Sequence, residues 1–162
     1  NVLVPKDRIV GEPGNGWQQV TSELAYERSG PERFLSSFRV FVELVRICGE
    51  APTPHQAAAI GRIASHFMTL RRMSLSVAGM LESGKDVSVE AALVKELGNN
   101  FEKLLPEIAR LAVPDLSAVD PDKQRLFRET FEETLMLSPS FTLRGGTREI
   151  MRGVIARGLG LR

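Results

Sequence analysis

Residues 53–84 read TPHQAAAIGRIASHFMTLRRMSLSVAGMLESG, and this stretch decides the fold class. Thr53, Pro54 and Gln56 form a typical helix start, in which threonine caps the first turn, proline fits its first position and glutamine completes a capping box. Apolar residues then recur every three or four positions, which is the period of an amphipathic helix. Gly84 is a natural stop for that helix. The stretch therefore predicts one long helix with an apolar face.

The same helical period is found before this stretch. Apolar residues from Phe34 to Val45 share one face of a first helix that starts near Trp17. Because proline removes a backbone hydrogen bond and clashes with the preceding turn, Gly30-Pro31 should kink this helix or divide it into two.

Further helices are expected after residue 84. Their expected starts lie near Asp86 or Ser88, at Asp120-Pro121 and near Thr147, and the first two should end before Pro114 and Ser138. The apolar residues expected on the first of them are Leu93, Leu97, Phe101, Leu104, Ile108 and Leu111. Four or five amphipathic helices with short connections predict an all-α domain of the four-helix-bundle type over residues 17–162.

The composition excludes several classes of function. The 162 residues are 43% hydrophobic and 25% charged, the balance of a folded globular domain. A net charge of +1 excludes binding to nucleic acid or anionic membranes by bulk charge. No apolar run reaches the roughly 20 residues that span a bilayer, and no secretory signal opens the chain, so a cytoplasmic location is expected. The single Cys48 excludes an internal disulfide and a cysteine zinc cluster, and His55 and His66 lack the spacing of a metal pair, so no metal site is expected.

Residues 1–16, NVLVPKDRIVGEPGNG, differ from the rest of the chain. Val2 and Val4 alternate with other residues, Pro5 breaks the alternation, and glycines follow. This pattern is typical of the tail of a β-structure and a linker, too small to fold alone. We therefore divide the chain into residues 1–16 and a helical domain over residues 17–162.

Glu27 and Arg28 are the first candidates for chemistry, in the segment ELAYERSGPERF. If Glu27 faces a dry pocket, desolvation would raise its pKa and make it a general base. The alternative from the pattern alone is a solvated charged helix face, which is the commoner arrangement for such residues.

The segment RGGTREI, residues 144–150, is the second candidate. Two glycines precede the first turn of a helix, whose free N–H groups suit a phosphate or diphosphate. An ordinary glycine loop with Thr147 as the helix cap would have the same pattern. The arginines that crowd this end of the chain could form an anion-binding face, pair with acids elsewhere or line a subunit interface.

Four segments together carry a resemblance to a known family. They are VLVPKDRIVGEPGNGW, ELAYERSG, MLESGKDVSVEAALVKELG and GGTREIMRGVIARGLGLR. In order and spacing they resemble the C-terminal part of the acyl-CoA dehydrogenase family over nearly the whole chain. The resemblance, and a start at Asn1 without methionine, imply a fragment that lacks the family's N-terminal helical domain and most of its middle β-domain.

The resemblance implies a flavoprotein that uses FAD to desaturate an acyl-CoA thioester between its α and β carbons. A carboxylate takes the α-proton, and the β-hydride moves to the flavin. The implied partners are the acyl-CoA substrate, an electron-transfer flavoprotein as electron acceptor, and further subunits in a homo- or heterotetramer.

The family places its catalytic base at either of two positions, and each can be compared with this chain. Many members place the catalytic glutamate just before the Gly-Thr of the last motif, which is Gly145 in this chain. A minority place it on the first long helix, directly before an arginine, which matches Glu27 and Arg28. The resemblance therefore implies Glu27 as the base, with Arg28 to position it or balance its charge.

The flavin contacts implied by the resemblance are incomplete. Gln56 matches the family's glutamine, and Arg46 stands one residue away from the family's Arg-x-x-Phe-Gly position. The other implied contacts are Gly145, Gly146, Thr147 and Glu149. A later Gln-x-x-Gly-Gly motif is not visible. An alternative is therefore a non-catalytic partner subunit of a heteromeric enzyme, which contributes flavin-site walls and oligomer contacts. A helical interaction module is a third possibility.

Overall fold

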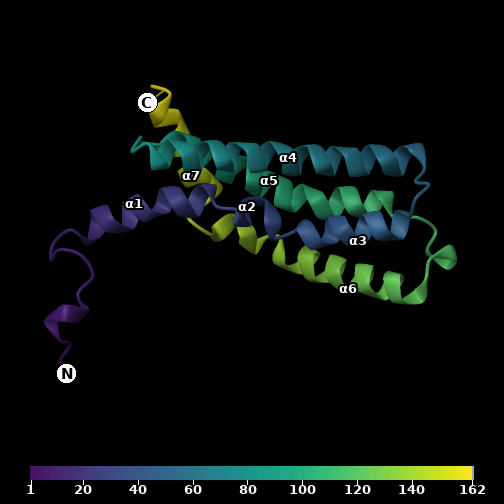
Figure 1. Cartoon of the computed structure of the whole chain (residues 1–162), viewed down its shortest axis with the longest axis horizontal. Coiled ribbons are helices and arrows are strands. Elements are labelled where there is room, and N and C mark those ends of the chain that lie inside the picture. Colours follow the sequence, from purple (N-terminus) through teal and green to yellow (C-terminus); the bar gives the residue numbers. More distant parts are fainter. Residues whose placement is uncertain (162) are drawn as a thin grey trace.

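The computed structural model describes residues 1–161, and every regular element within this range is helical (Figure 1). The α-helices are α1 (Gly16–Ser29), α2 (Glu32–Leu35), α3 (Phe38–Cys48), α4 (Pro54–Glu82), α5 (Ser88–Ala112), α6 (Pro121–Leu137) and α7 (Arg148–Gly158). Short 3-10 turns are η1 (Lys6–Arg8), η2 (Leu116–Ala118) and η3 (Ser140–Leu143). The prediction of an all-α fold is confirmed.

The helix ends follow the local signals of the sequence. At the start of α4, the Gln56 backbone N–H donates to Thr53 Oγ1 at 3.3 Å, and the Thr53 N–H donates to Gln56 Oε1 at 2.8 Å, which is the predicted capping box. Gly84 follows α4 with a φ of 71°, a left-handed conformation that glycine adopts without strain. At α6, the Asp120 side chain accepts from two backbone N–H groups, so this predicted cap is confirmed too.

The predicted break at Gly30-Pro31 divides the first helix. The helix α1 ends at Ser29, Gly30 is extended, and α2 is a single turn that leads to α3. Pro31 has no N–H to continue the hydrogen bonds of α1, which explains the break. The break lets α2 turn against α5, and this turn carries Arg33 into the interior, where it is only 2% exposed.

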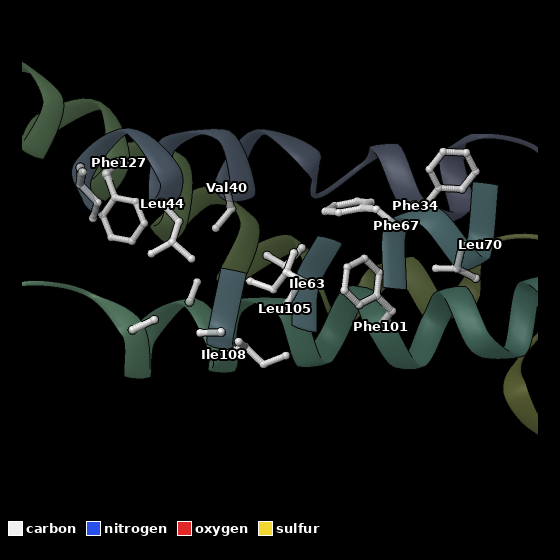
Figure 2. Packing of buried hydrophobic residues seen from close by; sticks show 14 residues of the cluster. Phe34, Val40, Leu44, Ile63, Phe67, Leu70, Phe101, Leu105, Ile108 and Phe127 are labelled. Atoms are coloured by element: carbon white, nitrogen blue, oxygen red, sulfur yellow. The ribbon is translucent and has the colours of Figure 1, made fainter. Parts of the chain in front are cut away.

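The long helices α4 and α5 run antiparallel, with α3 and α6 beside them toward one end and α1 and α7 toward the other (Figure 1). The helix α5 is central, because it contacts each of the other α-helices. Figure 2 shows the main core, where apolar side chains of α3, α4, α5 and α6 meet. Its most buried members include Leu44, Ile63, Phe101, Leu105 and Phe127.

The buried side of α5 differs from the predicted apolar face. Of the apolar residues expected on this helix, Leu93, Leu97 and Leu111 are 37%, 45% and 64% exposed and so lie outside the core. Phe101 and Ile108 are buried, and so are many small or polar residues of α5, which include Ala91, Lys95, Gly98, Asn99 and Glu102. Small residues allow close approach: a Cβ on Gly98 would lie 2.6 Å from the backbone oxygen of Arg33.

Residues 1–15 form no strand and carry only the 3-10 turn η1. Val2, Leu3 and Val4 are exposed. A β-strand needs a neighbouring strand to pair its backbone groups, and residues 1–161 contain none. The division of the chain near residue 16 stays a prediction. None of the helices within residues 1–161 is long and apolar enough to cross a membrane.

Candidate active site

Glu27, near the end of α1, lies against the glycine loop that precedes α7. Gly145 has a φ of 65°, and a Cβ built on it would lie 2.8 Å from Glu27 Oε1. The neighbouring Arg28 donates from Nε to the Gly145 carbonyl oxygen at 3.1 Å. Gly146 has a φ of 101°, and a Cβ there would lie 3.9 Å from Arg28 Nη2. The structure therefore brings four predicted site residues together from the two ends of the chain.

Arg33 holds Glu27 from inside the bundle. Its Nε and Nη2 donate to the Glu27 carbonyl oxygen at 3.1 and 2.9 Å, and Nη2 also contacts Glu27 Oε1 at 3.4 Å. Burial is the main cause that lowers the pKa of Arg33, and the nearby Arg144 adds to it. The Glu27 side chain is still 43% exposed, so its carboxylate is held on one side and accessible on the other.

The accessible side of Glu27 lines an open pocket of about 600 Å³. Its other charged or aromatic lining residues are Glu23, Tyr26, Glu32, Arg33 and Arg144. A carboxylate at a pocket wall, with a cation behind it, can accept a proton from a molecule bound in the pocket. The pocket is open and Glu27 is partly exposed, so the dry pocket considered for Glu27 in the sequence is not found within residues 1–161.

A buried charge cluster lies behind the loop. Lys95 and Glu102 of α5 are both 0% exposed. The Lys95 ammonium donates to the Arg144 carbonyl oxygen, and Arg144 Nη2 pairs with Glu102 Oε1 at 3.0 Å. Burial, reinforced by Arg33, lowers the pKa of Lys95 to about 8. Burial raises the pKa of Glu102 to about 7, although Arg144 pulls in the opposite direction.

Sequence reasoning missed Arg33, Lys95 and Glu102 as members of this site. One signal was available: Lys95, Asn99 and Glu102 have i, i+4, i+7 spacing, which places three polar residues on one face of a helix. Polar residues in this pattern usually face solvent, so the spacing alone does not indicate burial. No local pattern distinguishes Arg33 from the other arginines of its segment.

Thr147 stands at the N-cap position of α7, as in the alternative of an ordinary glycine loop, but its side chain makes no capping hydrogen bond. Glu149 is exposed, and the pKa of its carboxyl is lowered by its own backbone N–H and by the Thr147 hydroxyl. The following arginines pair with an acid: Arg148 and Arg152 contact Glu96 Oε1 of α5 at 3.0 and 3.1 Å. Arg144, Arg148 and Arg152 therefore pair with acids elsewhere in the chain, which was one of the alternatives for the C-terminal arginines.

Arg46 and Gln56 lie apart from this site. They flank the connection between α3 and α4, which is at the end of the bundle opposite α1 and α7 (Figure 1). Arg46 Nη1 pairs with Glu43 Oε1 at 2.7 Å, and the Gln56 side chain is engaged in the capping box. Of the residues expected to contact a flavin, only those of the loop and the start of α7 lie near Glu27. Arg46 and Gln56 already have internal partners.

Comparison with known proteins identifies relatives of the chain. It is 26% identical over 159 residues to the acyl-CoA dehydrogenase IpdE1 of Mycolicibacterium smegmatis, and the match covers 94% of this chain and 38% of that protein. It is 28% identical over 166 residues to the acyl-CoA dehydrogenase FadE29 of Mycobacterium tuberculosis, with 96% of this chain and 42% of that protein covered. No model of a protein family matches the chain.

The chain thus spans about two fifths of the length of the curated relatives that it matches. Both relatives match it along almost its whole length, and the fold is all-helical, as the resemblance implies. These findings agree with the resemblance carried by the motifs: the chain is similar to the C-terminal part of two acyl-CoA dehydrogenases.

Proposed function

We propose that the chain serves as the C-terminal helical part of an FAD-dependent acyl-CoA dehydrogenase, in which Glu27 removes the α-proton of an acyl-CoA thioester. The observation that carries this proposal is the contact between Glu27 and Gly145. A side chain at position 145 would project into the space that the Glu27 carboxylate occupies. The two sequence positions at which the family places its base are therefore neighbours in space. This supports Glu27 as the proton acceptor in a chain that has glycine at position 145.

The chain's own residues support proton transfer in three ways. The Glu27 carboxylate accepts the proton, since the thioester carbonyl makes the adjacent C–H acidic. Arg33 holds one carboxylate oxygen, so that the rotamer of Glu27 is restrained. Arg28 fixes the Gly145 carbonyl and keeps the loop beside the base. When bound, FAD would supply the acceptor for the β-hydride.

The residues proposed to face the flavin near Glu27 are Gly145, Gly146, Thr147 and Glu149. Because Arg46 and Gln56 lie at the opposite end of the bundle, we assign them to a flavin shared with another subunit of a homo- or heterotetramer. Acyl-CoA as substrate, an electron-transfer flavoprotein as acceptor and a cytoplasmic location belong to the same proposal.

One observation favours the alternative of a non-catalytic partner subunit. Arg46 is paired with Glu43, and Gln56 is used to cap its own helix, so both side chains have internal roles without a flavin. In this alternative, the chain completes the flavin site of a different subunit and holds no flavin alone.

The test uses the full-length protein that contains this chain. It is purified alone, its flavin absorbance is recorded, and bleaching by a panel of acyl-CoA thioesters is followed without oxygen. Glu27→Gln should keep the flavin and slow the bleaching by about 100-fold to 10,000-fold, the usual contribution of a positioned general base. The exposed carboxylate Glu133 of α6 provides the control, since Glu133→Gln should bleach like the wild type.

Two outcomes contradict the proposal. Unchanged bleaching in Glu27→Gln would remove Glu27 from the role of base. A wild-type protein that folds but carries no flavin, and gains bleaching only with a second subunit type, would favour the partner-subunit alternative.

A further inference from the structure

Lys95 and Glu102 of α5 hold the same residue, Arg144, at two points. They stand seven positions apart and so lie on one side of the helix. Lys95 donates to the backbone carbonyl of Arg144, and Glu102 accepts from its guanidinium at 3.0 Å. Arg144 Nη1 also donates to Ser36 Oγ at 3.1 Å. We call Lys95, Glu102 and Arg144 the α5 clamp.

The α5 clamp fixes the residue that directly precedes the glycine loop. Gly145 and Gly146 both have positive φ, and glycines bring conformational freedom that the loop must lose to keep one geometry. Two consecutive carbonyl groups accept hydrogen bonds from different helices, since Lys95 donates to that of Arg144 and Arg28 donates to that of Gly145. The loop is thus tied at both carbonyls to side chains from α5 and α1.

The burial of these charges is costly for the fold. Lys95, Glu102 and Arg33 are all 2% exposed or less, and an unpaired buried charge is strongly unfavourable. Apolar residues of similar volume often replace a buried ion pair without loss of stability. Stability by itself therefore provides little reason for a lysine at this point, whereas its bond to the loop does.

We propose that Lys95, together with Glu102, is a positioning residue that keeps the loop of residues 144–146 in the geometry in which Gly145 lies against the Glu27 carboxylate. This inference rests on the proposed function of Glu27. Lys95 does not touch the substrate pocket, and it acts through the Arg144 carbonyl. A small displacement of a reacting group can lower a rate by about 100-fold, so a mobile loop would impair the proton transfer.

The test compares Lys95→Met with Lys95→Arg in the flavin-loaded full-length protein. The control is Lys103→Met, which changes an exposed lysine on the same helix. Two quantities are measured: hydrogen exchange of the peptide that contains residues 144–147, and single-turnover flavin reduction over a range of acyl-CoA concentrations.

We expect Lys95→Met to speed exchange in the loop peptide and to leave the peptides of α3 and α6 unchanged. The limiting rate of flavin reduction should fall by about tenfold to 100-fold, while the acyl-CoA dissociation constant stays within about twofold. Lys95→Arg, which keeps a donor, should restore part of the rate. If Lys95→Met does not fold, Glu102→Gln tests the other contact of the α5 clamp, between Glu102 and the Arg144 guanidinium. It should also speed exchange in the loop peptide and lower the rate of flavin reduction, but by less.

Three results would overturn the inference. They are an unchanged loop exchange in Lys95→Met, a general rise of exchange across the bundle, and a rate loss that Lys95→Arg does not relieve. The first two outcomes are independent of catalysis. If Glu27→Gln keeps full bleaching, the proposed base is wrong, yet the loop exchange still decides whether Lys95 orders the loop.

Discussion

The carboxylate of Glu27 occupies the space beside Gly145: a Cβ on Gly145 would lie 2.8 Å from Glu27 Oε1 and 3.0 Å from Glu27 Cδ. The two residues come from opposite ends of the chain, one on α1 and the other in the loop before α7. A side chain at position 145 would therefore collide with the Glu27 carboxylate, whereas glycine leaves room for it.

Gly145→Ala should lower both stability and activity. The φ of 65° costs a non-glycine residue about 1–2 kcal/mol, and the new methyl group would push the Glu27 carboxylate away. Urea unfolding and flavin bleaching measure the two effects. Gly153→Ala is the control, because Gly153 lies inside α7 with little around it, and alanine there should stabilise the protein by about 0.5–1 kcal/mol. Equal stability of the two variants would contradict this explanation.

Gly98→Ala should separate α2 from α5. The new Cβ would lie 2.6 Å from the Arg33 backbone oxygen, and backbone cannot rotate away as a side-chain end can. Overpacking of this kind costs about 1–3 kcal/mol, and a shift of Arg33 should also loosen Glu27. Gly79→Ala, on α4 with open space around it, should cause no loss in the same unfolding experiment. A Gly98→Ala protein as stable as Gly79→Ala would show that the helices adjust freely.

Glu102→Gln should change the pH dependence of stability. Burial raises the pKa of Glu102 to about 7 in the folded chain, compared with 4.5 for a free glutamate. The unfolded chain therefore releases this proton first, and the folded wild type loses stability as pH rises from about 4.5 to about 7. Glutamine does not ionise, so this loss, at most about 3 kcal/mol, should disappear in the variant. Parallel curves of unfolding free energy against pH for the two proteins would contradict the shift.

Gln56→Ala and Thr53→Ala separate a flavin contact from a helix cap. Both variants break the capping box of α4, and each should cost about 0.5–2 kcal/mol. Only Gln56→Ala removes a side chain proposed to touch the flavin, so only this variant should lower the flavin content of the full-length protein. An equal flavin content in both variants would leave Gln56 with a structural role alone.

The predicted site residues fall into two groups when the chain folds. Glu27, Arg28, Gly145 and Gly146 come together, which the residue pattern alone did not indicate, because a charged helix and a glycine loop are common in any bundle. The residue pattern offered both segments as candidates beside commoner structural readings, and the resemblance to a family was needed to connect them as parts of one site. Arg46 and Gln56, singled out in the same way, lie at the other end of the bundle.

The helices and their ends were determined by the sequence itself. The period of apolar residues, the Thr53–Gln56 capping box, the break at Gly30-Pro31 and the stop at Gly84 act within a few residues, so the local sequence is sufficient to predict them. The tertiary structure decided which side of α5 is buried. The helix α5 contacts every other α-helix, and besides apolar packing, the close approach at Gly98 and the pairing of Glu102 with Arg144 lie on its buried side. Lys95 and Glu102 are enclosed there, while Leu97 stays exposed. Such burial depends on partners far away in the sequence, so it cannot be predicted from the local pattern of residues.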